Sequence, residues 1–335
     1  MCQQKRRLFV YLLFNGSSDS NGLAIFYFNT YQPFMTISGF SYIRNGFTYG
    51  YPFLQAIQSI LPICDEFVVA IGDSVDGTRE AILALNSPKI KIVDTVWDEN
   101  LRREGKIFAQ QSNAALMHCT GDWLFHIQAD EIIHERDLPI ILAEIQAAEK
   151  NPQMEGLLFD FLNFHGSYDY LNNTRKQHLV EIRVFRKGMN TFAYKDSQGF
   201  RNYSSYENYL AGEKGNKLKV KYIKVPVFHY NYVRDAAAMQ KKSHFFEKFW
   251  HDDAYLQAKY QAQKAFDFYH IERIKKFEGS HPQIMHELIA ASHFDFDPTK
   301  IYKKLSLKEK LVYGIEDIIG RRIGAYRNYV KIASR

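Results

Sequence analysis

The residues best suited to chemistry lie between Gly121 and Glu135, in the stretch GDWLFHIQADEIIHE. Its apolar residues, Trp123 to Ile127, have the length and bulk of a strand buried on both faces. Asp130 and Glu131 follow where that strand is expected to end, and ligands of open α/β sheets collect at the carboxyl ends of strands. Two adjacent carboxylates beside a core repel each other and are costly to desolvate. A hard divalent cation is one compensating partner, and a solvated strand-to-helix turn is the alternative.

A second polar stretch, GDSVDGT at Gly72 to Thr78, follows the apolar run EFVVAI. Glycine permits tight or left-handed backbone, and Asp76 or Thr78 can cap the helix predicted in REAILAL. Such a loop could hold a polar ligand near the positive end of a helix, although a simple capped turn is the more common explanation.

The elements around these motifs alternate between strand and helix. Pro52 and Pro62 bound a predicted helix, and a polar turn containing Arg44 ends the strand before it. This alternation predicts a parallel sheet covered by helices on both faces. Later runs are longer and extended, and the chain is expected to be helical from about Arg234. The predicted strands are 36–42, 66–71, 89–93, 123–127, 155–164, 180–186 and 217–230, and the predicted helices include 52–61, 79–85, 105–119, 137–150, 238–250 and 252–277.

Composition narrows the class of protein. The chain has 335 residues, 46% of them hydrophobic, which is enough for a large core. Its three cysteines are far apart and form no C-x-x-C pair, so a disulfide framework or zinc site is not indicated and a reducing, cytoplasmic location fits. The segment 300–335 holds ten basic and three acidic residues, a surplus of seven, whereas the rest is nearly neutral. We therefore expect no nucleic-acid partner for the main body.

The N-terminal residues 1–34 are expected to be a non-native or disordered extension. Lys5 to Arg7 and LFVYLLF superficially resemble a signal peptide, but NGSSDSNG interrupts the apolar run. That run is also far shorter than the ~20 residues of a membrane span. Because Met35 directly precedes the first credible core strand, we predict one domain over 35–233 and a helical C-terminal region over 234–335.

Together, these features resemble the family 2 glycosyltransferases of GT-A fold over roughly residues 36–235. Members commonly carry DDGSxDGT after the second strand and a D-x-D-like motif at the end of a later buried strand. The counterparts here are AIGDSVDGT at 70–78 and IQADE at 127–131, and Lys106 to Asn113 followed by GDW is similar to the lead-in to the acidic motif. The resemblance implies a Rossmann-like α/β fold, with a mostly parallel sheet flanked by helices and, in this chain, a C-terminal helical extension.

Two departures from the family pattern stand out. Ile71 and Gly72 occupy positions where the family often has paired acids, and Gln128 stands at the first acidic position of the second motif. The resemblance implies a Mg²⁺ or Mn²⁺ ion held by Asp130 with Glu131, and by His229 in PVFHY, although an ordinary surface or core histidine is the alternative. It also implies a nucleotide-sugar site, for which we predict Arg44, Asp73, Asp76, Arg102, Lys106 and Gln128; a run such as LRREGK is more often a solvated face.

An inverting transfer needs a base that takes the proton of the acceptor hydroxyl, usually a carboxylate. The stretch RVFRKGMNTFAYKDSQGFR resembles the acceptor side of related enzymes. It makes Asp196 the first choice for the base, with Glu207 and Glu181 as alternatives.

The C-terminal segment carries an apolar stripe with a basic remainder, formed by Leu305, Leu311, Val312, Ile315, Ile318 and Ile319. This pattern fits a peripheral helix on the anionic inner face of a membrane, where lipid-linked acceptors reside, or a helix packed on its own domain. The predicted function is transfer from a nucleotide sugar to a glycan or lipid-linked acceptor in surface polysaccharide or lipopolysaccharide synthesis. The alternative is a catalytically silent nucleotide- or sugar-binding homologue that lost its first acid to Gln128.

Overall fold

Four parallel strands form the first half of the main sheet, in the order β3, β2, β1, β4. The computed structural model describes residues 35–101, 105–188, 190–196, 199–262, 265–293 and 296–332; the predicted extension 1–34 and Arg102 lie outside them. The strands agree with those predicted, and their carboxyl ends share one edge because they are parallel. They span Ile37–Ile43 (β1), Glu66–Ile71 (β2), Ile90–Asp94 (β3) and Trp123–His126 (β4).

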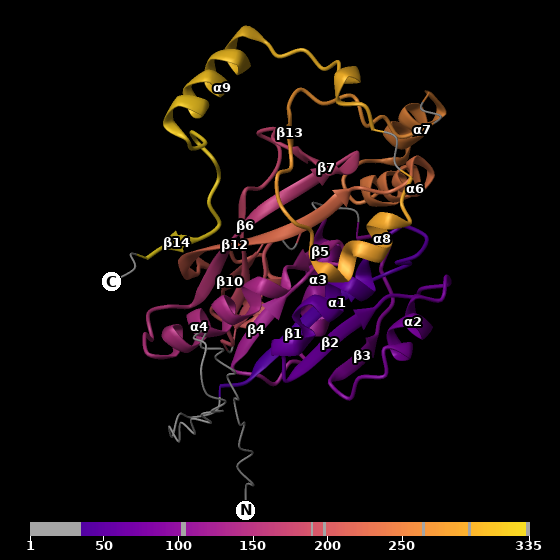
Figure 1. Ribbon diagram of the computed structural model, residues 1–335. Coiled ribbons are helices and arrows are strands. Elements are labelled where there is room, and N and C mark those ends of the chain that lie inside the picture. Colours follow the sequence, from indigo (N-terminus) through magenta and orange to yellow (C-terminus); the bar gives the residue numbers. More distant parts are fainter. Residues whose placement is uncertain are drawn as a thin grey trace, which may run out of the picture. The chain divides into compact units, whose positions relative to one another are not determined.

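Helices cover both faces of this parallel half (Figure 1). Successive side chains of β2 point to opposite faces, so Phe67 and Val69 join one core cluster while Val68 and Ala70 join the other. The first cluster includes α1 and α4, and the second includes α3. The helices are Phe53–Ile60 (α1), Thr78–Ala84 (α2), Lys106–Leu116 (α3) and Leu138–Glu149 (α4).

The second half of the sheet is mixed. β8 runs antiparallel to both β4 and β6, whereas the long strand β12 runs parallel to β6 and antiparallel to the short strand β5. The predicted strands 155–164, 180–186 and 217–230 are therefore confirmed. The strands are Glu131–Ile133 (β5), Gly156–His165 (β6), Ser167–Asn172 (β7), Val180–Arg186 (β8), Lys219–Tyr232 (β12), Ile274–Lys276 (β13) and Val330–Lys331 (β14), with Thr191–Ala193 (β9), Phe200–Asn202 (β10) and Asn216–Lys217 (β11) in a separate small sheet.

In the described part of the chain after residue 233, most regular elements are helices, which agrees with the predicted α/β class with a helical extension. The predicted helix over 252–277 is wrong in its second half, because α7 ends at Ala262 and Ile274–Lys276 forms β13. This strand pairs antiparallel with β7, whose backbone groups would otherwise form an open sheet edge. No described helix is long and apolar enough to cross a membrane. The helices are Tyr206–Leu210 (α5), Ala236–Glu247 (α6), Asp253–Ala262 (α7), His286–Ala290 (α8) and Leu307–Ile319 (α9).

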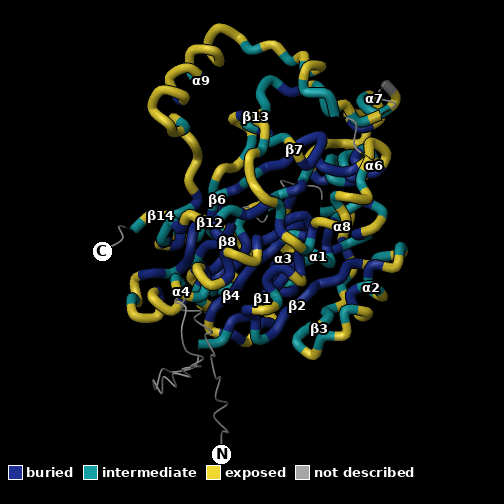
Figure 2. The backbone as a smooth tube through the Cα atoms, in the orientation of Figure 1, coloured by how far each residue is buried: buried dark blue, intermediate teal, exposed yellow. Residues whose placement is uncertain are grey.

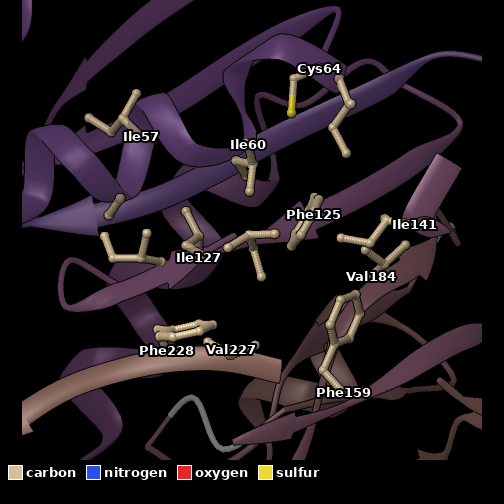
Figure 3. Close-up of a cluster of buried hydrophobic side chains, with 14 of the residues drawn as sticks. Ile57, Ile60, Cys64, Phe125, Ile127, Ile141, Phe159, Val184, Val227 and Phe228 are labelled. Atoms are coloured by element: carbon tan, nitrogen blue, oxygen red, sulfur yellow. The ribbon is translucent and has the colours of Figure 1, made fainter. Parts of the chain in front are cut away.

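Strand β4 is held firmly between neighbouring elements. Phe125, at its centre, is fully buried in the cluster that also contains Ile57, Ile60 and Phe228 (Figure 3). Burying each such side chain stabilises the fold by roughly 1.5–3 kcal/mol. The central strands are correspondingly buried along most of their length, whereas α9 is largely exposed (Figure 2). The residues that follow β4 therefore leave a rigid support.

Candidate functional site

A cavity of about 290 Å³ opens at the carboxyl ends of β1 and β4. Polar side chains from several elements reach it, among them Asp130 after β4, His229 from β12 and Lys242 from α6. Its other walls are rich in aromatic side chains, which offer flat surfaces for stacking. These are Tyr42, Tyr49, Tyr51, Trp97, Phe108, Phe161, Phe245, Phe246 and Trp250.

The turn between β4 and β5 places Asp130 in the cavity. The backbone N–H of Glu131 donates to the carbonyl of Gln128, and the N–H of Tyr230 donates to the carbonyl of Asp130. In the antiparallel pairing of β5 with β12, His229 stands opposite Glu131. Asp130 and His229, which are 99 positions apart in the sequence, are thereby neighbours.

Asp130 is buried and surrounded by cationic groups. Its Oδ2 atom accepts hydrogen bonds from Lys242 Nζ at 3.1 Å and from Arg234 Nη2 at 3.4 Å. Burial alone would raise its pKa, but Lys242 and Arg234 outweigh that effect and hold the pKa well below its ordinary value. Asp130 is therefore ionised, and the solvated turn considered from the sequence does not describe it.

Lys242 is also buried. Burial lowers its pKa to about 7; the nearby charge of Arg234 adds to this effect, and Asp130 opposes it. The amine lies 5.0 Å from the centre of the Tyr51 ring, and the Arg234 guanidinium lies 4.8 Å from the same ring. Lys242, which is protonated in about half of the molecules at pH 7, and the Arg234 guanidinium thus share one carboxylate against an aromatic wall.

Hydrogen bonds of Asn163 assign the tautomer of His229. The Asn163 amide donates from Nδ2 to the carbonyl of His178 at 2.8 Å, so its Oδ1 faces His229 Nδ1, also at 2.8 Å. The Nδ1 atom must then carry the proton, and burial lowers the pKa of the ring, which favours its neutral form. The lone pair of Nε2 consequently faces Asp130 Oδ1, 3.7 Å away.

Glu131 differs from its neighbour Asp130. It is fully buried, and both of its carboxylate oxygens accept hydrogen bonds from Arg183, at 2.6 and 2.7 Å. A metal ion could bind Glu131 only by displacing Arg183 from this bidentate ion pair. The geometry therefore fits a structural role for Glu131 and does not fit the predicted role of metal ligand.

The three carboxylates considered as bases lie in different places. Asp196 lines the cavity, and Gly105 packs so closely that a Cβ there would lie 2.7 Å from Asp196 Cβ. Glu181 also lines the cavity, and burial raises its pKa to about 8, with Arg183 opposing the shift. Glu207 lies on the exposed helix α5 and is not among the residues of the cavity wall.

The predicted nucleotide-sugar residues are only partly brought together. Arg44 and Gln128 line the cavity, whereas Lys106 is exposed and does not. Arg44 pairs with Asp73 at 2.8 Å, which holds Asp73 beside the cavity wall. Asp76 instead accepts hydrogen bonds from the backbone of Thr48 and from Thr78, so it orders the loop before α2.

The absence of an acid at Gly72 has a steric reason. A Cβ at this position would lie 2.5 Å from Nε1 of Trp97, which is itself part of the cavity wall. Any side chain would displace that indole. The position of Trp97 in the aromatic wall therefore requires glycine at position 72.

Sequence reasoning missed the cationic half of the site, namely Lys242, Arg234 and Arg183. Helix α6 was predicted, but its lysines are indistinguishable from those of a solvated helix face. The available signal was VRD directly after β12, because Arg234 follows the strand that carries His229.

No family model and no curated protein matches the sequence. Solved structures that resemble the chain include S. aureus TarS 1-349 in complex with UDP, with 19% identity over 39% of this chain and 36% of that one, and a TM-score of 0.29. A structure of TarS 1-349 alone gives 14% identity over 64% and 70%, with a TM-score of 0.36. Glucosyl-3-phosphoglycerate synthase from Mycobacterium tuberculosis, with Mn²⁺, UDP and phosphoglyceric acid, gives 18% identity over 38% and 43%, with a TM-score of 0.28. The chain spans less than half of the TarS–UDP and synthase chains.

Proposed function

We propose that the chain is a glycosyltransferase of GT-A type, which moves a sugar from a nucleotide-sugar donor to a glycan or lipid-linked acceptor. The observation that carries the proposal is the ionised Asp130 at the carboxyl end of β4, in a cavity that is also lined by Lys242 and His229. A carboxylate with cationic groups beside it suits a diphosphate, with or without a bridging cation, and aromatic walls suit a base or a sugar ring.

A divalent cation fits two of the three residues expected to hold it. Asp130 Oδ1 and the lone pair of His229 Nε2 face each other, and Asn163 orients the histidine as an outer partner would. Among the described residues no group of three or more His, Cys, Asp or Glu side chains could hold a metal. We therefore propose Asp130 and His229 as ligands of Mg²⁺ or Mn²⁺, with donor phosphates and water as the others. When bound, the ion would neutralise charge that develops on the departing diphosphate.

Lys242 is proposed to bind the same diphosphate, and Arg234, which does not line the cavity, is proposed to position Asp130. Both cations are buried and already within hydrogen-bond reach of the Asp130 carboxylate, so their charges act in a poorly solvated site. The contribution of Lys242 grows as the bond to the sugar breaks and negative charge accumulates on the leaving group. Arg44, positioned by Asp73, is proposed to line the nucleotide side.

Asp196 is the proposed base of an inverting transfer. It lines the cavity beside Gly105, and a carboxylate there can accept the proton of an acceptor hydroxyl that enters from the same side. Glu181 is the alternative, but a carboxyl group with a pKa of about 8 is mostly protonated at neutral pH and is then a poor base. The exposed position of Glu207 makes it the weakest of the three.

The class of acceptor suggests the biological process in which we propose that the chain acts. Synthesis of a surface polysaccharide or lipopolysaccharide takes place on lipid-linked acceptors at the inner face of the membrane, and the basic C-terminal segment fits that location.

A thermal-shift panel tests the proposal. UDP, GDP, CDP and dTDP and their sugars are each added with and without Mn²⁺, and a ligand of the native state must raise the melting temperature by mass action. We expect one base to give the largest shift. No shift with any member of the panel would contradict a nucleotide-sugar site.

A further inference from the structure

Helix α9 is attached to the protein by its polar side. Tyr313 and Glu316 are its buried residues. The hydroxyl of Tyr313 accepts a hydrogen bond from the backbone of Arg175 at 2.9 Å, and the Arg175 guanidinium pairs with Glu316. After the helix, Arg322 donates to the carbonyls of Thr174 and Gln177. These contacts fix which face of α9 points towards the rest of the chain.

The apolar side of α9 faces outward. Leu307, Leu311 and Ile318 are 85%, 66% and 86% exposed, and their spacing places them on one face of the helix. Ile315 and Ile319 extend the same face and are also exposed. Helices normally turn such a stripe towards the core, so this one is reversed. Of the two sequence interpretations, packing of the stripe on its own domain does not describe this helix. Figure 2 shows α9 as exposed along most of its length.

The helix is well formed despite this exposure. Ser306 and Glu309 make a capping box at its start, and Gly320 ends it in a left-handed conformation. The exposed apolar face is therefore presented by an ordered helix and is not a consequence of fraying.

Charge decides between the possible occupants of this face. Lys304, Lys308, Lys310 and Arg321 are exposed around the stripe, within a segment whose basic residues outnumber the acidic ones by seven. A second copy of the chain would bring the same positive surplus against it, which is unfavourable. We propose that α9 lies on an anionic lipid surface, with its apolar face among the acyl chains and its lysines at the headgroups.

This surface adjoins the candidate site. Arg322 binds the loop at Thr174 to Gln177, and Gln177 and His178 line the cavity. Lipid contact at α9 would thus bring the cavity close to acceptors held in the membrane. Binding to lipid does not itself require the transferase activity, so the two proposals can fail separately.

Co-sedimentation of the full chain with vesicles tests the apolar face. Vesicles of phosphatidylcholine containing phosphatidylglycerol are compared with vesicles of phosphatidylcholine alone, and the anionic vesicles are expected to bind. Glutamine has a helix propensity close to that of leucine, so L307Q/L311Q/I318Q should stay folded. Because the variant loses apolar area on the exposed face, its affinity for the vesicles should fall at least about tenfold. The matched control L83Q/V96Q/L210Q removes exposed apolar residues elsewhere and should bind like the parent.

A second pair of variants tests the charge. K308Q/K310Q/R321Q should weaken binding to the anionic vesicles on the order of a hundredfold, roughly fivefold for each basic residue. The control K150Q/K214Q/K224Q has the same net charge and should leave binding unchanged. Equal binding by the α9 variants and the parent would overturn the proposal, as would absence of parent binding. Loss of self-association in L307Q/L311Q/I318Q, with vesicle binding retained, would instead assign the face to a second copy.

Discussion

Lys242 Nζ lies 3.1 Å from Asp130 Oδ2, although 112 positions separate the two residues in the chain. This contact joins the end of β4 to helix α6, and Arg234 reaches the same carboxylate oxygen. The acidic motif therefore lies beneath buried cations, and the positive charge around it is as much a part of the candidate site as the carboxylate.

Replacing Lys242 with methionine should weaken binding of the nucleoside diphosphate that gives the largest thermal shift. Loss of a hydrogen bond to a charged group costs about 1.5–3 kcal/mol, which corresponds to roughly tenfold to a hundredfold in Kd. Calorimetric titration measures the change. Lys241→Met on the exposed side of the same helix is the matched control and should bind normally. Unchanged affinity in Lys242→Met would assign Lys242 a purely structural role.

Glu181 should make stability depend on pH. Burial raises its folded-state pKa from 4.5 to about 8, so the folded protein binds an extra proton between these values. The stabilising contribution is complete below about pH 4.5 and is lost as the pH rises towards 8, with a slope of at most about 1.4 kcal/mol per pH unit. Urea unfolding of the parent and Glu181→Gln across this range should differ by this slope, since the variant lacks the contribution of Glu181. Parallel curves would show that Glu181 is not perturbed in this way.

Turnover measurements on variants distinguish the proposed base from its alternatives. Asp196→Asn should lower kcat by roughly 10²–10⁴-fold, the usual contribution of general base catalysis, while donor binding is largely retained. Glu207→Gln, on exposed α5, should change kcat little. If Glu207→Gln has the large effect and Asp196→Asn the small one, the assignment made from the cavity is incorrect.

Arg183 is expected to stabilise the fold by pairing with the Glu131 carboxylate. Arg183→Met leaves the fully buried Glu131 carboxylate without its partner, which should cost about 3–5 kcal/mol in the free energy of unfolding. The double variant Arg183→Met/Glu131→Gln should recover part of the loss. Arg79→Met breaks the exposed pair with Asp94 and should change the free energy of unfolding far less. Equal losses in the two single variants, measured by urea unfolding, would argue against a buried pair.

Local sequence patterns predicted much of the fold and, within the site, the carboxylate and the histidine. The apolar run 66–71 coincides with β2, and the two prolines bound α1, because buried strands and helix ends leave strong local signals. Asp130 and His229 were both placed at strand ends and do lie together. Whether Arg183 binds Glu131 depends instead on which strand lies beside which, and no local pattern contains that information. Lys242 was not predicted for the same reason, because its contact with Asp130 forms only in the folded chain.

Turnover of the nucleotide sugar selected by the thermal-shift panel, measured with Mn²⁺ and again after chelation, tests the role of Asp130. Asp130→Asn removes the negative charge at nearly constant volume, and its folding is checked by a cooperative melting transition. We expect transfer or slow hydrolysis by the parent, and a loss of turnover on the order of a hundredfold or more in Asp130→Asn. Equal turnover by a folded Asp130→Asn variant would contradict the central role of Asp130. Binding of the donor without any turnover by the parent would favour a catalytically silent homologue.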